Sequence, residues 1–345
     1  MQKTHRSWWL QRAMVFTLLL TATPEDAAAD LQQQLETMAR AHHGKVALYA
    51  KHLKTGATVS IDAGRPVQTA SVIKLPIMLE AFAQVKSGKR SLDDKIVLRE
   101  ADKVPGSGIL QFLRPGAQFT LEDAVVLMMT LSDNTSTNLV IDQVGIPAVN
   151  ARSAAMGLKN TYLYKKVYRK AEGPMPEDQK QFGLGKTTAR EMAAVLESIE
   201  ACDLGDAKLC ARMIEIMKNQ QSRQMIARYL ETADTTEVRS GVAAKLGELD
   251  DVKNEVALVY TETGPIVISI FTWDNQDQRW MADNQAYLLI ARMARTIVDA
   301  WAPKGVVWHR DQDATRRAAN RNRPLRHLIP LACSPVGEAP QPGIT

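Results

Sequence analysis

The sequence predicts an α/β fold: an antiparallel sheet flanked by N- and C-terminal helices, with an all-helical insert. Three observations lead to this expectation. Strand-like runs occur near both ends of the chain, the apolar spacing between them is that of helices, and a last helical stretch closes the chain. Strands of one sheet have to meet in space, so the intervening helices are expected to form an insertion. With 345 residues, 45% of them hydrophobic, the chain can bury such a core.

The N-terminal part supplies a helix and a hairpin. Residues 30–41 repeat apolar side chains at helical spacing. Strand-like runs at 45–53 and 57–61 follow, joined by a Lys-Thr-Gly turn that is typical of a hairpin. A helix is then expected over residues 71–85, because Pro76 is tolerated only near a helix start.

The central part is mainly helical, with helices expected at 121–131, 136–144 and 188–199. Between residues 157 and 186 the helical periodicity fails, and glycine and proline become frequent. Structureless loops of that length are usually functional or mobile.

The C-terminal part returns to strands. A helix at 208–218 precedes strand-like runs at 241–246, 255–261 and 266–272, and a closing helix is expected at 281–301. A Glu-Thr-Gly-Pro turn separates the last two runs. These strands and the N-terminal hairpin complete the predicted sheet.

These elements divide the chain. Residues 30–70 and 201–301 are expected to form the α/β part, and residues 71–200 the helical part. Residues 1–29 are predicted to be a signal peptide, because they contain basic residues, then a short apolar run, then three alanines before Asp30. An uncleaved anchor is the alternative, although the apolar run is short for a bilayer. The basic, Pro/Arg-rich tail at 302–345 is expected to be disordered.

A signal peptide predicts a periplasmic or secreted protein with no stable membrane span after processing. In an oxidising compartment Cys202 and Cys210 would pair, and the alternative is two buried free thiols. Cys333 lies in the tail and is expected to be unpaired. The net charge is +5, but acidic residues are spread among the basic ones, which argues against nucleic-acid binding. The histidines lack metal-ligand spacing, so no metal is expected.

Ser71 and Lys74 are the first candidate catalytic residues. Three residues apart on a helix, they share a face, so the lysine can reach the serine hydroxyl. Serine needs an adjacent base to act as a nucleophile, and a lysine serves if burial or nearby positive charge lowers its pKa. Lys74 is also a cation within an otherwise apolar helix, which is costly unless the charge is paired or used.

The tripeptide from Ser132 to Asn134 lies between two predicted helices. Asp133 suits a helix N-cap, which is the purely structural interpretation. In the catalytic interpretation, Ser132 relays a proton to the leaving nitrogen, while Asn134 binds the substrate amide and helps to hold Lys74.

Lys245 and Gly247 lie on a predicted strand. Lys245 would offer a positive charge to a substrate carboxylate and lower the pKa of Lys74, whereas the structural interpretation is a surface lysine at a strand end. Gly247 would allow close approach of backbone to the ligand. The backbone N–H groups of Ser71 and Glu248 would then form an oxyanion hole.

In the order Ser-x-x-Lys, Ser-Asp-Asn, Lys-x-Gly, these elements resemble class A β-lactamases, a family of penicillin-recognising active-site-serine enzymes. The resemblance covers roughly residues 30–301 and includes further runs at 106–110, 121–123, 132–138, 186–189 and 245–260. It implies a monomeric serine hydrolase without a cofactor, acting on a small molecule such as a β-lactam or a cell-wall-peptide-like compound.

Two positions depart from the family pattern. The glutamate that activates water for deacylation falls near Val167, within a basic run, and the nearest acids are Glu172 and Glu177. Unless a shifted loop presents one of them as the base, the acyl-enzyme should turn over slowly. Leu246 replaces a threonine whose hydroxyl helps to bind the substrate carboxylate, a loss of roughly 1.5–3 kcal/mol.

Three functions follow as hypotheses. The first is a β-lactamase-like hydrolase that opens a β-lactam or a related amide or ester through acyl-Ser71. The second is a penicillin-binding or D,D-peptidase-like protein that is acylated but deacylates slowly. The third is a non-catalytic ligand sensor, against which the intact set of candidate residues argues.

Overall fold

The central sheet of the computed structural model is antiparallel and has the strand order β2-β1-β11-β10-β9. The structure describes residues 24–171, 173–230, 238–239, 241–307 and 309–310. Both ends of the chain supply strands, as predicted: β1 (Lys45–His52), β2 (Thr58–Ile61), β9 (Val242–Glu248), β10 (Lys253–Thr261) and β11 (Gly264–Trp273). The predicted fold class is confirmed.

The sheet is buried on both faces. Val256 and Leu258 of β10 lie in the apolar core beneath the sheet, and the alternate residues Ala257 and Val259 lie in a second core above it. Successive side chains of a strand point to opposite faces, so a strand covered on both sides reads as a continuous apolar run. The strand-like runs predicted at residues 255–261 and 266–272 correspond to β10 and β11.

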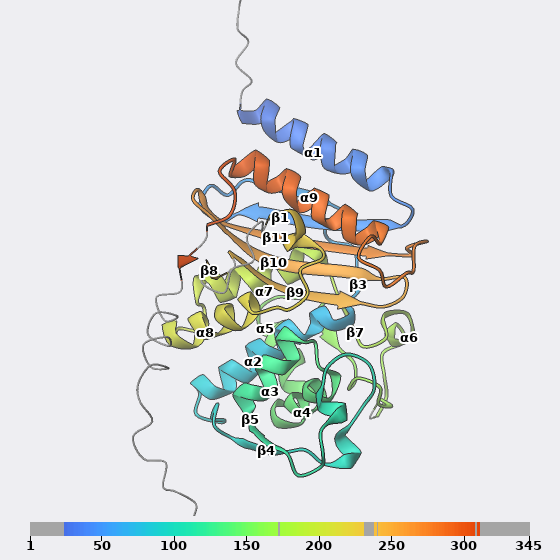
Figure 1. The fold of residues 1–345 in the computed structure, drawn as a ribbon, viewed down its shortest axis with the longest axis vertical. Helices are drawn as coiled ribbons and strands as arrows, with labels where there is room; N and C mark the ends of the chain where they lie inside the picture. The colour runs from blue at the N-terminus through green and yellow to red at the C-terminus, as the bar shows by residue number, and fades with distance from the viewer. Residues whose placement is uncertain (1–23, 172, 231–237, 240, 308, 311–345) are drawn as a thin grey trace, which may run out of the picture.

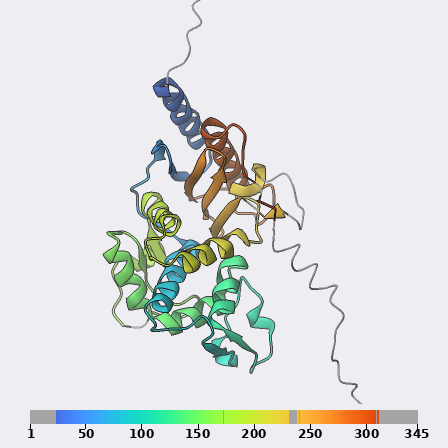
Figure 2. The ribbon, with the colours of Figure 1, turned by 90° about the vertical axis from the view of Figure 1, so that its left-hand side faces the viewer.

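Two terminal helices cover one face of the sheet, and the helical part covers the other (Figures 1 and 2). The terminal helices are α1 (Pro24–Arg40) and α9 (Gln285–Trp301). The closing helix starts later than predicted because the Asn284 side chain accepts hydrogen bonds from Ala286 N and Tyr287 N as its N-cap. Helix α1 starts before Asp30, whereas residues 1–23 of the predicted signal peptide lie outside the described residues.

The helical part is arranged around α2, which is buried at every residue from Lys74 to Gln84. Its helices are α2 (Lys74–Lys86), α3 (Leu121–Thr130), α4 (Asn134–Val144), α5 (Ile146–Ala155), α7 (Ala189–Ala201) and α8 (Ala207–Lys218). Helix α8, expected in the α/β part, contacts β9 of the sheet as well as α2 and α3, so it lies in the core between the sheet and the helical part. A disulfide between Cys202 and Cys210 joins α8 to α7, which confirms the predicted pairing.

The segment between residues 157 and 186, for which no structure was predicted, contains short elements. They are β6 (Tyr162–Leu163), α6 (Gln179–Phe182) and β7 (Gly185–Thr187); β7 pairs with both β6 and β3 (Val67–Gln68). Pieces this short show no periodicity in a sequence. The remaining elements of this kind are η1 (Ala70–Ile73), β4 (Lys95–Val97), η2 (Glu100–Asp102), η3 (Leu110–Phe112), β5 (Gln118–Thr120) and η4 (Ile226–Tyr229).

The start of the tail was predicted too early. After α9, Val306 bridges to Thr261 at the end of β10, and β12 (His309–Arg310) pairs with β8 (Val238–Arg239). Residues 302–310 therefore belong to the folded part, as far as they are described, and Cys333 lies outside the described residues. Among the helices of the described segments, none has both the length and the apolar content to cross a bilayer.

Candidate active site

Three elements bring the candidate residues together. The short helix η1 carries Ser71 and leads directly into α2, which begins at Lys74. The junction of α3 and α4 carries Ser132, and the edge strand β9 carries Lys245. Ala70 and Ser132 both have positive φ values, of 44° and 54°. Non-glycine residues in this region carry backbone strain, which in folded proteins gathers at functional sites.

The amine of Lys74 is fully buried and donates to three acceptors: Ser132 O at 2.7 Å, Ser132 Oγ at 3.0 Å and Asn134 Oδ1 at 3.1 Å. These bonds use all three donors of a lysine ammonium. Half-buried Ser71 lies one turn earlier, and its hydroxyl is not among the acceptors. Loss of one proton would leave Lys74 with a lone pair that can accept the proton of Ser71.

Lys245 is also buried, and its amine donates to Ser132 Oγ at 3.1 Å and to Leu246 O at 2.7 Å. The Ser132 hydroxyl therefore accepts from two lysine amines at once. A hydroxyl has one donor besides its two acceptor lone pairs, so its own proton remains available to a further partner. Lys245 is thus directed into the site, as predicted, rather than exposed at a strand end.

Burial sets the charge of both lysines. It lowers the pKa of Lys74 well below that of an ordinary lysine, and the charge of Lys245 lowers it further, against the opposing effect of Asp133. Burial also lowers the pKa of Lys245 to about 7, opposed by the carboxylates of Glu248 and Glu255. A lysine with a lowered pKa is able to act as a base near neutral pH.

Asp133 fixes the loop over the site. One carboxylate oxygen accepts from Ser136 N at 2.8 Å and caps α4, as predicted. The other accepts from Ile109 N at 2.7 Å and Leu110 N at 2.9 Å, and so ties this loop to the start of α4. The N-cap interpretation of Asp133 is therefore correct, and the same side chain also positions its two neighbours, Ser132 and Asn134.

Gly247 allows β9 to approach the helix that carries Ser71. A Cβ atom at this position would lie 2.8 Å from Ser71 N and 2.6 Å from Thr69 O, closer than side chains tolerate. Gly247 was predicted to leave room for a ligand. In the structure, its missing side chain leaves room for the backbone of Thr69 and Ser71. The carboxylate of Glu248 accepts a hydrogen bond from Tyr287 of α9, so only its backbone N–H is a candidate for the oxyanion hole.

Leu246 occupies the opposite face of β9 from Lys245. It is buried with Met225 and Ile226 in the core beneath α1 and α9. Strand alternation places neighbouring residues on opposite faces, so the leucine at position 246 packs in the core and offers no hydroxyl to a substrate. Its partner on β10 is Glu255, a buried carboxyl that accepts from Ile226 N.

We expect Glu255→Gln to stabilise the fold at pH 8 but not at pH 4. Burial raises the pKa of Glu255 from 4.5 to about 7, so the folded state holds this proton more tightly than the unfolded chain. Its contribution to stability is greatest below pH 4.5 and is lost as the pH rises to about 7, a difference of about 3 kcal/mol at most. Urea unfolding at both pH values measures it, with the exposed Glu177→Gln as control.

Val167 lies in the segment near which the sequence comparison predicts the family's water-activating glutamate. Its backbone is held by the side chain of Asn138: Val167 N donates to Oδ1 at 2.8 Å, and Nδ2 donates to Val167 O at 2.9 Å. Asn138 follows Asn134 by four residues on α4, so both lie on one helix face. Asn138 is thus a residue that the three sequence motifs miss, although its spacing from Asn134 was the available signal.

Of the two acids proposed as alternative bases, the structure describes only Glu177. Glu177 is exposed in the turn before α6, and its neighbour Asp178 is bonded to Tyr164 and Lys186. Within the described part of the chain, no hydrogen bond or ion pair joins Glu177 to a candidate catalytic residue. Glu172 lies outside the described residues.

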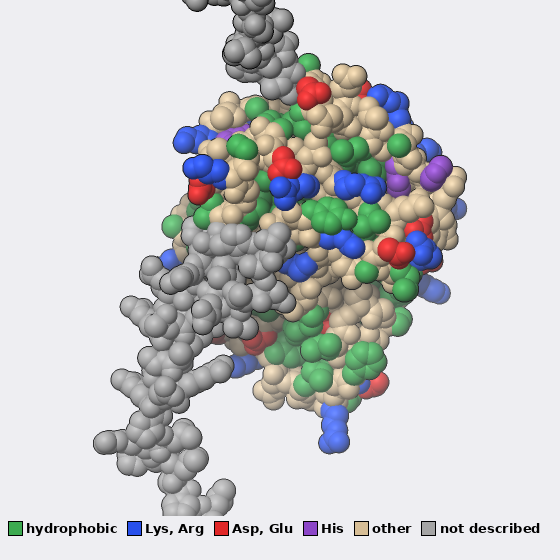
Figure 3. All heavy atoms as spheres, turned by 45° about the horizontal axis from the view of Figure 1, so that its top comes forward, with side chains coloured by type: hydrophobic (Ala, Val, Ile, Leu, Met, Phe, Trp, Pro, Cys, Tyr) green, Lys and Arg blue, Asp and Glu red, His purple; other side chains and the backbone are tan. Residues whose placement is uncertain are grey.

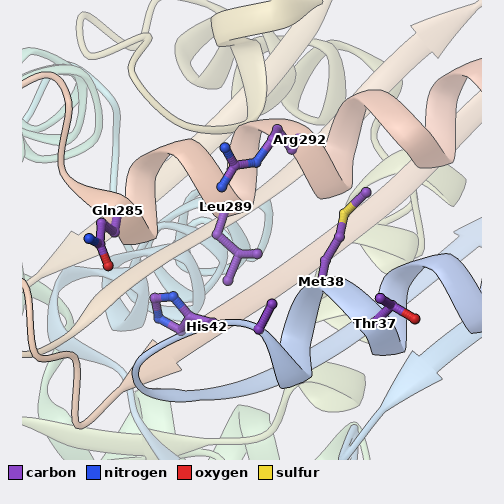
Figure 4. A pocket seen from close by; sticks show the side chains of 7 residues that line it. Thr37, Met38, His42, Gln285, Leu289 and Arg292 are labelled. Carbon is purple, nitrogen blue, oxygen red and sulfur yellow. The ribbon is translucent and has the colours of Figure 1, made fainter.

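A cavity of about 350 Å³ between α1 and α9 lies away from these residues (Figure 4). His42 and Leu289 line it on the sheet face opposite the helical part, so it does not belong to the candidate site. On the described part of the face in Figure 3, Lys and Arg side chains lie scattered among acidic and apolar ones.

The chain matches a known protein family and several known proteins. The family described as "Beta-lactamase enzyme family" matches residues 30–301. The chain is similar to a beta-lactamase of Rhodobacter capsulatus, with 24% identity over 292 residues that cover 82% of this chain and 92% of that protein. The crystal structure of a beta-lactamase from Sphaerobacter thermophilus has 30% identity and a TM-score of 0.66, covering 79% and 96% of the two chains. A mutant of PBP-A, solved as an acyl-enzyme with penicillin G, has 23% identity and a TM-score of 0.68, covering 79% and 96%.

Proposed function

Because the chain belongs to the beta-lactamase enzyme family, we propose that a β-lactam or a related amide or ester acylates Ser71 and that the acyl group leaves slowly. The observation that carries the acylation step is the Ser132 hydroxyl, which accepts from two buried lysine amines beside the helix that bears Ser71. Val167, at the position of the deacylating glutamate, supports slow release. The predicted signal peptide supports action in the periplasm or outside the cell.

Acylation would proceed as follows. Neutral Lys74 takes the proton of Ser71 Oγ, which forms a bond to the substrate carbonyl carbon. The backbone N–H groups of Ser71 and Glu248 bind the oxygen that becomes negative. The carbonyl–nitrogen bond then breaks, Ser132 donates its proton to the leaving nitrogen, and the proton on Lys74 replaces it through the 3.0 Å contact. The product is an ester on Ser71 and a neutral Lys74.

A time course of intact mass after addition of a labelled penicillin tests this function. We expect one acyl group per chain that persists over many minutes, and none in Ser71→Ala, which retains the melting temperature of the unmodified protein. A short-lived adduct with released product would instead establish an efficient hydrolase. Absence of any adduct on the unmodified protein would overturn the proposal and leave a non-catalytic sensor.

A further inference from the structure

Tyr168 is an exposed aromatic residue in a left-handed backbone conformation, next to Val167. Its side chain and backbone are 65% exposed, and its φ is 52°. A large non-glycine residue seldom adopts this conformation, which costs free energy and persists only where the surrounding structure determines it. A tyrosine at this position is therefore explained neither by burial of its ring nor by a preference of tyrosine for the left-handed conformation.

The neighbours of Tyr168 are fixed on both sides. Before it, the backbone of Val167 is bonded twice to Asn138. After it, the guanidinium of Arg169 donates to Ala101 O at 2.5 Å and to Lys103 O at 3.3 Å. The backbone of Tyr168 is thus held in place, although its ring faces solvent. A ring fixed in this way is preorganised for contact with a ligand.

The ring lies next to the residue proposed to bind the substrate amide. A Cβ atom built on Gly106 would be 3.3 Å from Cε2 and 3.4 Å from Oη of Tyr168, and 2.7 Å from Nδ2 of Asn134. Gly106, at φ 90°, therefore touches both side chains, and a larger residue would enter the space next to them. Asn134 in turn accepts a hydrogen bond from Lys74. Only the side chain of Asn134 therefore lies between the neighbourhood of the exposed ring and the catalytic lysine.

We propose that Tyr168 is a specificity-determining residue that contacts the acyl side chain of the substrate and favours flat aromatic groups there. The proposal rests on the proposed function, since it needs an acyl donor bound at Asn134. An aromatic group attached beside the bound amide would stack on the exposed ring, and such ring pairs attract each other beyond the burial of their area.

Two penicillins that differ in this group test the proposal. Benzylpenicillin carries an aromatic acyl side chain, and 6-aminopenicillanic acid carries none. The second-order rate constant of adduct formation is measured by intact mass for each probe. The main variant is Tyr168→Asn, because asparagine adopts the left-handed conformation readily and removes the ring without added strain. Tyr168→Phe keeps the ring, and Tyr162→Asn changes another exposed tyrosine of the same segment.

We expect Tyr168→Asn to slow acylation by benzylpenicillin about tenfold and to leave acylation by 6-aminopenicillanic acid within twofold of the unmodified protein. Tyr168→Phe and Tyr162→Asn should match the unmodified protein with both probes. Equal losses with both probes, or no loss with either, would overturn the assignment of Tyr168 while leaving acylation intact. If neither probe acylates the unmodified protein, the proposed function fails first, and the role of Tyr168 falls with it.

Discussion

Val167→Glu should accelerate release of the acyl group from Ser71 by at least about 100-fold. A positioned general base contributes roughly 10²–10⁴-fold to proton transfer from water. Position 167 is suited to carry that base because its backbone is bonded to Asn138, one helical turn from Asn134. The substitution leaves both backbone bonds available. The measurement is the decay of the penicillin adduct, followed by intact mass after removal of free penicillin.

Val167→Gln is the matched control, because glutamine has the size of glutamate without its basicity. In the glutamate variant, release should slow at low pH as the carboxylate gains a proton, whereas the unmodified protein should lack this acid limb. If the glutamine variant released the acyl group as fast as the glutamate variant, a change in loop packing rather than a base would explain the gain.

Lys74→Ala should slow acylation of Ser71 by about 10³-fold, since it removes the proposed general base. The substitution also removes a buried amine that three protein acceptors surround, so the protein has to be shown folded by its melting temperature. Lys89→Ala, a change of another lysine in the turn that follows α2, should leave the acylation rate unchanged. An undiminished rate in Lys74→Ala would assign the base to another group.

The pH dependence of acylation gives an independent measure of the same chemistry. Lys74 acts as the base in its neutral form, so the acylation rate should fall as the pH decreases through the lowered pKa of Lys74. Lys245 acts as a cation with a pKa of about 7, so the rate should fall again as the pH rises above that value. Arginine stays charged at any of these pH values. Lys245→Arg should therefore abolish the decline on the alkaline side, and an unchanged decline would exclude Lys245 as its source.

The sequence predicted the site wherever short-range spacing decides geometry. Ser71 and Lys74 are one turn apart, and Asp133 caps the helix that follows it. The order of the three motifs then identified Lys245, although no local pattern shows that its amine meets Ser132 across 113 residues. The two strong helix signals of α7 and α8 were likewise found, while the packing of α8 with the helical part depends on tertiary contacts.

Contacts between loops could not be predicted in this way. Such contacts involve irregular segments, whose sequences show no helical or strand periodicity. Examples are the hydrogen bonds between Asn138 and Val167 and the approach of Tyr168 to Gly106. The location of Leu246, by contrast, follows from the sequence. Lys245 and Leu246 are consecutive residues of a strand, so placing the lysine in the site puts the leucine on the opposite face.

The pairing of β1 with β11 has a consequence for synthesis. Lys45 lies opposite Trp273, and His52 opposite Ile266, so one edge of β1 lacks its partner strand until more than 200 further residues have been made. Until then an apolar strand edge stays uncovered, a state that invites aggregation, and such non-local pairing slows folding. A nascent chain that ends before β9 would carry Ser71 without Lys245, so the proposed acylation would have to await the complete sheet.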